Sequence, residues 1–121
     1  MEKDMLKFRT KIFALKAIEF TGKTPKNRLG IIVENQLLRC ATSVGCNYRS
    51  IKAAKSTKDF INKMNIVYEE ADEAQYWLEL LMDSKTMKEE DILPLYQEAK
   101  EITAMTVASI KTAKINNRKK F

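Results

Sequence analysis

Leu38 to Arg49, which reads LRCATSVGCNYR, is the stretch that decides the fold. It lies within a long amphipathic segment, yet small and polar residues dominate it. Gly45 costs roughly 1 kcal/mol relative to alanine inside a helix. A glycine at such a position usually marks the close approach of another backbone. We therefore expect the patch around Ala41, Thr42 and Gly45 to pack tightly against another helix; the alternative is a slot for a cofactor.

Apolar residues recur at helical spacing on both sides of this stretch and predict helices over about 4–20, 25–55, 57–82 and 95–114. A short lead-in turn precedes Pro94. We expect Gly22 to be a left-handed cap and Thr24-Pro25 to begin the second helix. Capping boxes at Ser56 and Thr86 begin the later helices. Short loops between four helices predict an all-α, antiparallel up-down-up-down four-helix bundle. It forms a single domain over residues 1–115, followed by a basic flexible tail at 116–121.

The composition excludes several classes of function. The chain has no histidine, which excludes Ser-His and Cys-His nucleophiles and the usual zinc hydrolase sites. Cys40 and Cys46 point about 120° apart on a helix, so they cannot form a disulfide there, and we interpret both as small core residues. The sequence therefore predicts no catalytic residues, no cofactor and no metal, and the protein is not expected to be an enzyme.

The N-terminus and the charge pattern indicate where the protein is located and which partners it binds. MEKDMLKFRTK contains no apolar run, so we expect a cytoplasmic protein without a membrane segment. Residues 1–60 hold thirteen Lys/Arg and five Asp/Glu, whereas residues 69–101 hold eleven acidic and three basic groups. Blocks of opposite sign suit nucleic-acid binding or head-to-tail contact between identical subunits.

Two clusters of basic residues are the candidates for phosphate contacts. One follows the central stretch and the other lies at the C-terminus. Together they comprise Arg49, Lys52, Lys55, Lys58, Lys63, Arg118, Lys119 and Lys120. A pI of about 9.3 favours an RNA or DNA contact. The alternative is solvated charge that keeps the protein soluble.

Three segments together resemble a known family: NQLLRCATSVGCNYR, KSTKDFINKMNIVYEEADEAQYWLELL and EAKEITAMTVASIKTAK. They are similar to the bacterial four-helix-bundle family of 23S rRNA-intervening-sequence proteins. The matching motif residues are Arg39, Ser43, Gly45, Asn47, Tyr48, Glu70, Glu73, Tyr76 and Trp77. Two positions depart from the family pattern. Cys46 stands in place of Ala or Ser, and Ser50 replaces an acidic residue.

The resemblance implies a four-helix bundle that assembles as a homo-oligomeric ring, plausibly a pentamer. Members are named for reading frames within inserts in bacterial ribosomal RNA genes. An accessory variability determinant of diversity-generating retroelements, which works with a reverse transcriptase and RNA, is related in fold. The family has no assigned catalytic residues and its function is unknown.

Several motif residues admit two interpretations. Arg39 and Arg49 either contact phosphates or form ion pairs with Glu70 or Glu73. Asn47 either fixes helix register through a buried hydrogen bond or binds a ligand. Tyr76 and Trp77 either stack on bases or fill a core or a subunit contact.

The leading hypothesis is a non-enzymatic, oligomeric bundle that contacts RNA or DNA through basic residues at its rim, without strong sequence specificity. The alternative is a protein–protein interaction scaffold with no nucleic-acid role, which binds through its acidic third helix or an apolar groove.

Overall fold

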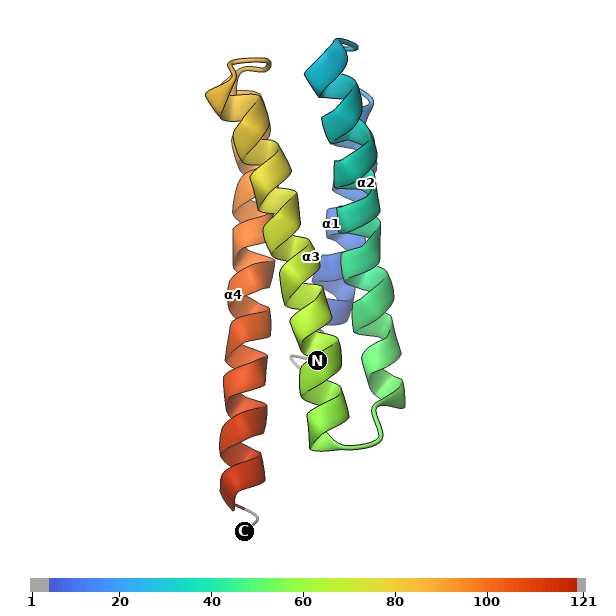
Figure 1. The fold of residues 1–121 in the computed structure, drawn as a ribbon, viewed down its shortest axis with the longest axis vertical. Coiled ribbons are helices and arrows are strands. Elements are labelled where there is room, and N and C mark those ends of the chain that lie inside the picture. The colour runs from blue at the N-terminus through green and yellow to red at the C-terminus, as the bar shows by residue number, and fades with distance from the viewer. Residues whose placement is uncertain (1–4, 120–121) are drawn as a thin grey trace.

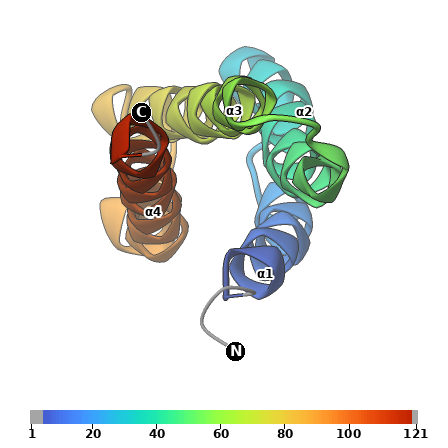
Figure 2. The ribbon, with the colours of Figure 1, turned by 90° about the horizontal axis from the view of Figure 1, so that it is seen from below.

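A computed structural model describes residues 5–119, and the regular structure of this part is entirely helical (Figure 1). The four long helices are α1 (Met5–Thr21), α2 (Arg28–Arg49), α3 (Thr57–Asp83) and α4 (Glu89–Lys119). A short 3-10 helix, η2 (Ser50–Ala53), follows α2. Seen along the bundle, the four helices follow one another around a common axis in chain order (Figure 2). The predicted all-α, antiparallel four-helix bundle is confirmed.

The core consists of the inner faces that the helical spacing predicts. Phe13 of α1, Leu37 of α2, Met64 of α3 and Ile102 of α4 are all essentially buried. Arg9 joins α1 to α4 across the remaining side, because its guanidinium contacts Glu98 at 2.9 Å and Glu101 at 2.6 Å. Hydrogen bonds to these two carboxylates raise the pKa of Arg9, so the guanidinium stays charged.

The two cysteines have different environments. Cys40 is fully buried in the core, as expected, but Cys46 is exposed. The interpretation of Cys46 as a core residue is therefore wrong. Cys46 belongs to the outward stripe of α2, which also carries Asn35, Thr42 and Arg49.

The connection between α1 and α2 differs from the prediction. Gly22 is not left-handed, since no glycine of the described chain has a positive φ. Helix α2 begins at Arg28 rather than at Pro25, because Asn27 is the N-cap and its side-chain oxygen accepts a hydrogen bond from the Gly30 backbone N at 2.8 Å. The loop folds back so closely that a Cβ on Gly30 would lie 1.8 Å from the Pro25 carbonyl oxygen.

The other helix ends agree with the prediction only in part. Ser56 caps α3 as predicted, and its hydroxyl accepts from the Asp59 backbone N at 3.1 Å. The left-handed residue of the described chain is Lys85, with φ of 59°, just after α3. Thr86 does not begin α4, because its hydroxyl pairs with that of Ser84 at 2.7 Å and the helix starts only at Glu89.

Helix α4 is longer and more continuous than predicted. Pro94 lies inside it rather than between a lead-in turn and a second helix. Pro94 forfeits one backbone hydrogen bond, and as the sixth residue of α4 it lies just after the four N-terminal amides that have no intrahelical partner in any helix. Residues 116–119 remain helical, so the predicted flexible tail does not begin at residue 116. Residues 120 and 121 lie outside the described range.

Candidate nucleic-acid interface

One end of the bundle gathers most of the predicted basic residues. The C-terminus of α2, η2, the start of α3 and the last turns of α4 lie together at the lower end of Figure 1. A cleft at this end is lined by Lys55 and Phe60 on one side and by Ala113 and Asn116 on the other. We call residues 46–64 and 107–118 the basic end. They contain eight Lys/Arg and a single acidic residue, Asp59.

The predicted phosphate contacts fall into three groups. Arg49, Lys52, Lys55, Lys58 and Arg118 are exposed at the basic end. Lys63 is partly buried and pairs with Asp59 at 3.7 Å, which makes it a weaker candidate. Lys119 is the last residue of α4; its side chain and Lys120 lie outside the described part of the structure. The two clusters are far apart in the sequence but lie at the same end of the bundle. Lys55 of the first cluster lies beside the last turns of α4, which carry the second.

Sequence reasoning missed two further lysines at this end. Lys111 and Lys114 are exposed on α4. With Arg118 they form steps of three and four residues, which places all three on one face of the helix. That spacing can be read from the sequence, but the three residues share a helix face only because α4 continues to residue 119.

Arg39 has the ion-pair role rather than the phosphate role. Its guanidinium contacts Glu70 at 3.2 Å and also pairs with Glu73, so it links α2 to α3. Gln36 accepts a hydrogen bond from Arg39 Nε at 3.1 Å, and Trp77 Nε1 donates to Glu73 at 3.1 Å. Since the network is partly exposed, each ion pair contributes less than about 1 kcal/mol.

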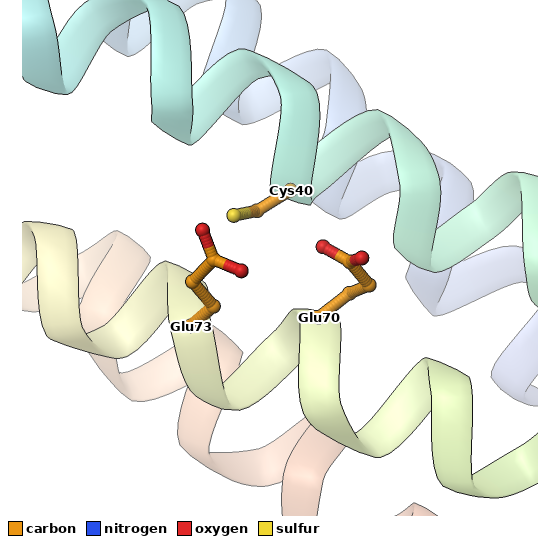
Figure 3. Close-up of side chains that lie close together, drawn as sticks. All are labelled: Cys40, Glu70 and Glu73. Atoms are coloured by element: carbon orange, nitrogen blue, oxygen red, sulfur yellow. The ribbon is translucent and has the colours of Figure 1, made fainter.

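Cys40 lies beside these carboxylates. Figure 3 shows the thiol of Cys40 and the carboxylates of Glu70 and Glu73 pointing toward one another across the α2–α3 contact. Their ligand atoms lie within 4.8 Å of one another, a spacing that a metal ion could use. The Arg39 guanidinium already supplies positive charge to both carboxylates. Burial, reinforced by Glu73, raises the pKa of the Cys40 thiol to about 12. The donor set therefore fits an ion-pair network with a protonated thiol better than a cation site.

Glu73 remains ionised in this network. Burial opposes its charge, but hydrogen bonds from Trp77 and Cys40, and then the charge of Arg39, outweigh that effect and lower the pKa of the carboxyl. A lowered pKa means that the folded state favours the carboxylate over the acid. Glu73 thus ties the motif residues of α2 and α3 together at neutral pH.

The remaining motif residues pack or form hydrogen bonds within the bundle. A Cβ on Gly45 would lie 3.4 Å from the Thr10 carbonyl oxygen, which confirms close packing of α1 on α2. Asn47 donates to the Ser43 carbonyl at 2.9 Å and to its hydroxyl at 2.8 Å. Both bonds lie within α2, so they do not fix its register against another helix. Tyr48 packs partly against the core.

Tyr76 and Trp77 differ in exposure. Trp77 packs partly against the core, whereas Tyr76 is 54% exposed, and the two rings meet edge to face with centroids 5.4 Å apart. Tyr76 lies on the outward side of α3, one helical turn after the acidic residues Asp72 and Glu73. That surface is poorly suited to a nucleic acid, because its charge has the wrong sign.

Comparisons with known proteins identify the family and the fold. No helix of the described chain combines the length and apolar character needed to span a membrane. A crystal structure of a protein of unknown function from the S23 ribosomal protein family of Bacteroides thetaiotaomicron shares 32% sequence identity. It superposes with a TM-score of 0.83, over 92% of this chain and 99% of that chain. None of the curated proteins is significantly similar. The family model described as 23S rRNA-intervening sequence protein matches residues 7–108, and the chain therefore belongs to that family.

Proposed function

We propose that this protein is a non-enzymatic, oligomeric bundle that binds RNA or DNA through its basic end without sequence preference. The observation that carries the proposal is the concentration of eight Lys/Arg with one acidic residue at a single end of the bundle. A nucleic-acid strand that meets this end exchanges its condensed counterions for side-chain cations, and the released ions drive binding.

The side chains at the basic end favour phosphate contacts over base recognition. The aromatic residues there, Tyr48 and Phe60, are partly buried and pack against the core. They are poorly placed to stack on bases. Lysine contacts to phosphate position a strand but carry no sequence information. This supports binding without sequence preference.

Exposed apolar residues on α1 support assembly. Phe8, Leu15 and Ile18 are 66%, 54% and 52% exposed on the outward side of a helix whose inward side is also apolar. Large apolar side chains that gather on an exposed face normally mark an interaction surface. A second copy of the chain would cover it, in line with the ring that the family resemblance implies. A ring would repeat the basic end in every subunit, so weak phosphate contacts would act together.

The test of nucleic-acid binding is the salt dependence of affinity. Fluorescence anisotropy with a labelled single-stranded oligonucleotide gives log K against log salt concentration. A triple variant, Lys52→Ala, Lys55→Ala and Lys58→Ala, removes three charges from the basic end. If each lysine contacts a phosphate, the slope should fall by about 2, since each contact to a single strand contributes about 0.7.

A matched control removes the same charge elsewhere. Lys16, Lys23 and Lys88 are exposed and lie outside the basic end, so their combined change to alanine should leave the slope within about one contact of wild type. Equal effects of the two variants would show a dependence on net charge alone. Absence of binding at low salt would overturn the nucleic-acid role. A protein partner that survives nuclease treatment in a pull-down would then favour the interaction scaffold.

A further inference from the structure

A second basic feature lies outside the predicted clusters, in the seam between α1 and α2. There a cleft of about 480 Å³ opens beside Gly45. Because α1 packs closely on α2 at this glycine, small residues form much of the cleft wall. Its lining residues are Lys7, Thr10, Lys11, Ala14, Thr42, Gly45, Cys46, Tyr48 and Arg49.

Among the residues that the structure describes, those lining the cleft bring positive charge and no negative charge. Two of its cations come from α1, Lys7 and Lys11, and the third, Arg49, comes from α2. None of the described residues that line it is acidic, and within the described part of the chain these three cations form no ion pair. Lys7 and Lys11 lie four residues apart on one face of α1, and like charges at that spacing destabilise a helix. An anion in the cleft would relieve that repulsion.

A second cleft on α1 shows the contrast. It has a similar volume of about 460 Å³ and also carries two lysines, Lys16 and Lys23. Glu19 and Asp91 line it as well, so its charge is balanced from within the protein. No carboxylate occurs among the described residues that line the seam cleft, and this difference separates an anion site from an ordinary solvated groove.

Two threonine hydroxyls of the cleft are already engaged with backbone carbonyls. Thr10 donates its hydroxyl proton to the Lys7 carbonyl at 3.2 Å, and Thr42 donates to the Leu38 carbonyl at 2.7 Å. Among the lining residues, Lys7, Lys11 and Arg49 are cations that carry only donors, so they are the groups that would hold an anion. Charge-assisted bonds from such groups to phosphate oxygens are among the strongest in proteins.

We propose that the seam cleft binds a phosphate group of a single-stranded nucleic acid, held by Lys7 and Lys11 of α1 and Arg49 of α2. The inference rests on the proposed function and gives the bound strand a defined path. Arg49 is shared by the cleft and the basic end, so a strand on the basic end continues along the α1–α2 seam. The volume of the cleft lies within the usual range for small-ligand sites, about 300–1,000 Å³, which suits one nucleotide unit rather than a duplex.

The exposed thiol of Cys46 provides a direct test, because it lines the cleft. Cys40 is buried and its pKa is raised to about 12, so an uncharged alkylating reagent should modify Cys46 first, and mass spectrometry can verify the position. The rate of Cys46 alkylation is measured with and without a single-stranded oligouridylate at low salt. We expect the rate to fall about tenfold at about ten times Kd, because only about a tenth of the clefts are then empty.

Variants separate the cleft from the basic end. Lys7→Gln with Lys11→Gln should abolish the protection of Cys46 while most of the anisotropy signal at the basic end remains. Lys16→Gln with Lys23→Gln removes the same charge from the other cleft and should leave protection intact. Protection that persists in the Lys7 and Lys11 variant would overturn the assignment of these residues.

The remaining outcomes also decide the matter. Binding of the oligonucleotide by anisotropy without protection of Cys46 would overturn this inference and leave the proposed function standing. Absence of both would overturn the two together. Inorganic phosphate and a free nucleoside triphosphate are run at matched phosphate concentration and ionic strength. If either protects Cys46 as well as the oligonucleotide does, the cleft is a site for small phosphate compounds and the nucleic-acid assignment is wrong.

Discussion

The two glycines of α2 should respond to alanine in opposite ways. A Cβ at Gly30 would lie 1.8 Å from the Pro25 carbonyl oxygen and 2.9 Å from its carbonyl carbon. The carbonyl oxygen would have to retreat by about 1.5 Å or more to reach ordinary contact. A Cβ at Gly45 would lie 3.4 Å from the nearest atom, the Thr10 carbonyl oxygen, which is already an ordinary contact distance.

The magnitudes follow from these contacts. Moving the loop before α2 threatens the cap bond from Gly30 to Asn27, which contributes about 1 kcal/mol. Overpacking adds about 1–3 kcal/mol, and the better helix propensity of alanine offsets about 1 kcal/mol. We expect Gly30→Ala to lower the free energy of unfolding by about 2 kcal/mol. Gly45→Ala keeps its propensity gain and should raise that free energy by up to about 1 kcal/mol.

Urea unfolding followed by far-ultraviolet circular dichroism measures both changes. All three proteins are compared at one protein concentration, because an assembling protein has a concentration-dependent midpoint. Equal m-values are required for a simple interpretation. A Gly30→Ala variant as stable as wild type would refute the tight loop. A loss above about 1 kcal/mol in Gly45→Ala would mean that α1 lies closer to α2 than described.

Three further predictions concern the ion-pair network, assembly and the charge of the whole molecule. Glu73→Gln should lose stability relative to wild type at neutral pH. Because the folded-state pKa of Glu73 is lowered, its contribution is present above the unfolded value of about 4.3 and is lost as pH falls through the folded pKa. The difference between the two proteins should thus shrink in acid, and a gap that widens would contradict the network. Phe8→Ser with Leu15→Ser should shift light scattering toward the monomer without unfolding the protein; an unchanged mass would show that α1 is not the contact. Moderate sodium chloride should raise the midpoint of thermal unfolding, because it screens repulsion at the basic end over a Debye length of about 10 Å at 0.1 M. A midpoint that falls instead would show that ion pairs such as Arg39–Glu73 outweigh the repulsion.

Helical spacing made most of the core predictable. Met64 and Leu78 of α3, for example, are buried as their positions require. Helix ends were less predictable, because each depends on one local competition. Asn27 rather than Thr24 caps α2, since the Asn27 side chain reaches the Gly30 amide after the loop has folded back. Such a choice depends on the path of the loop, and single-residue preferences do not encode that path.

The candidate site shows a different limit. The charges of Lys52, Lys55 and Lys58 are evident in the sequence, but their approach to the last turns of α4 depends on the lengths of two helices. Lys7 and Lys11 were overlooked, because lysines on a helix are usually solvated. The pattern that could have drawn attention to them is the complete absence of acidic residues between positions 5 and 18.

Folding alone does not explain why positive charge is concentrated at one end of this molecule. Outside the basic end, the described residues hold thirteen acidic and twelve basic groups, a nearly balanced surface on which Arg9 and Arg39 pair with carboxylates. At the basic end, one carboxylate faces eight cations, and mutual repulsion opposes the compact state. A bundle of this kind needs no such concentration of charge for its core, since the described buried residues are apolar or threonine. This repulsion lowers the stability of the folded chain. A bound polyanion would neutralise the basic end, and the same charges would then contribute to the affinity.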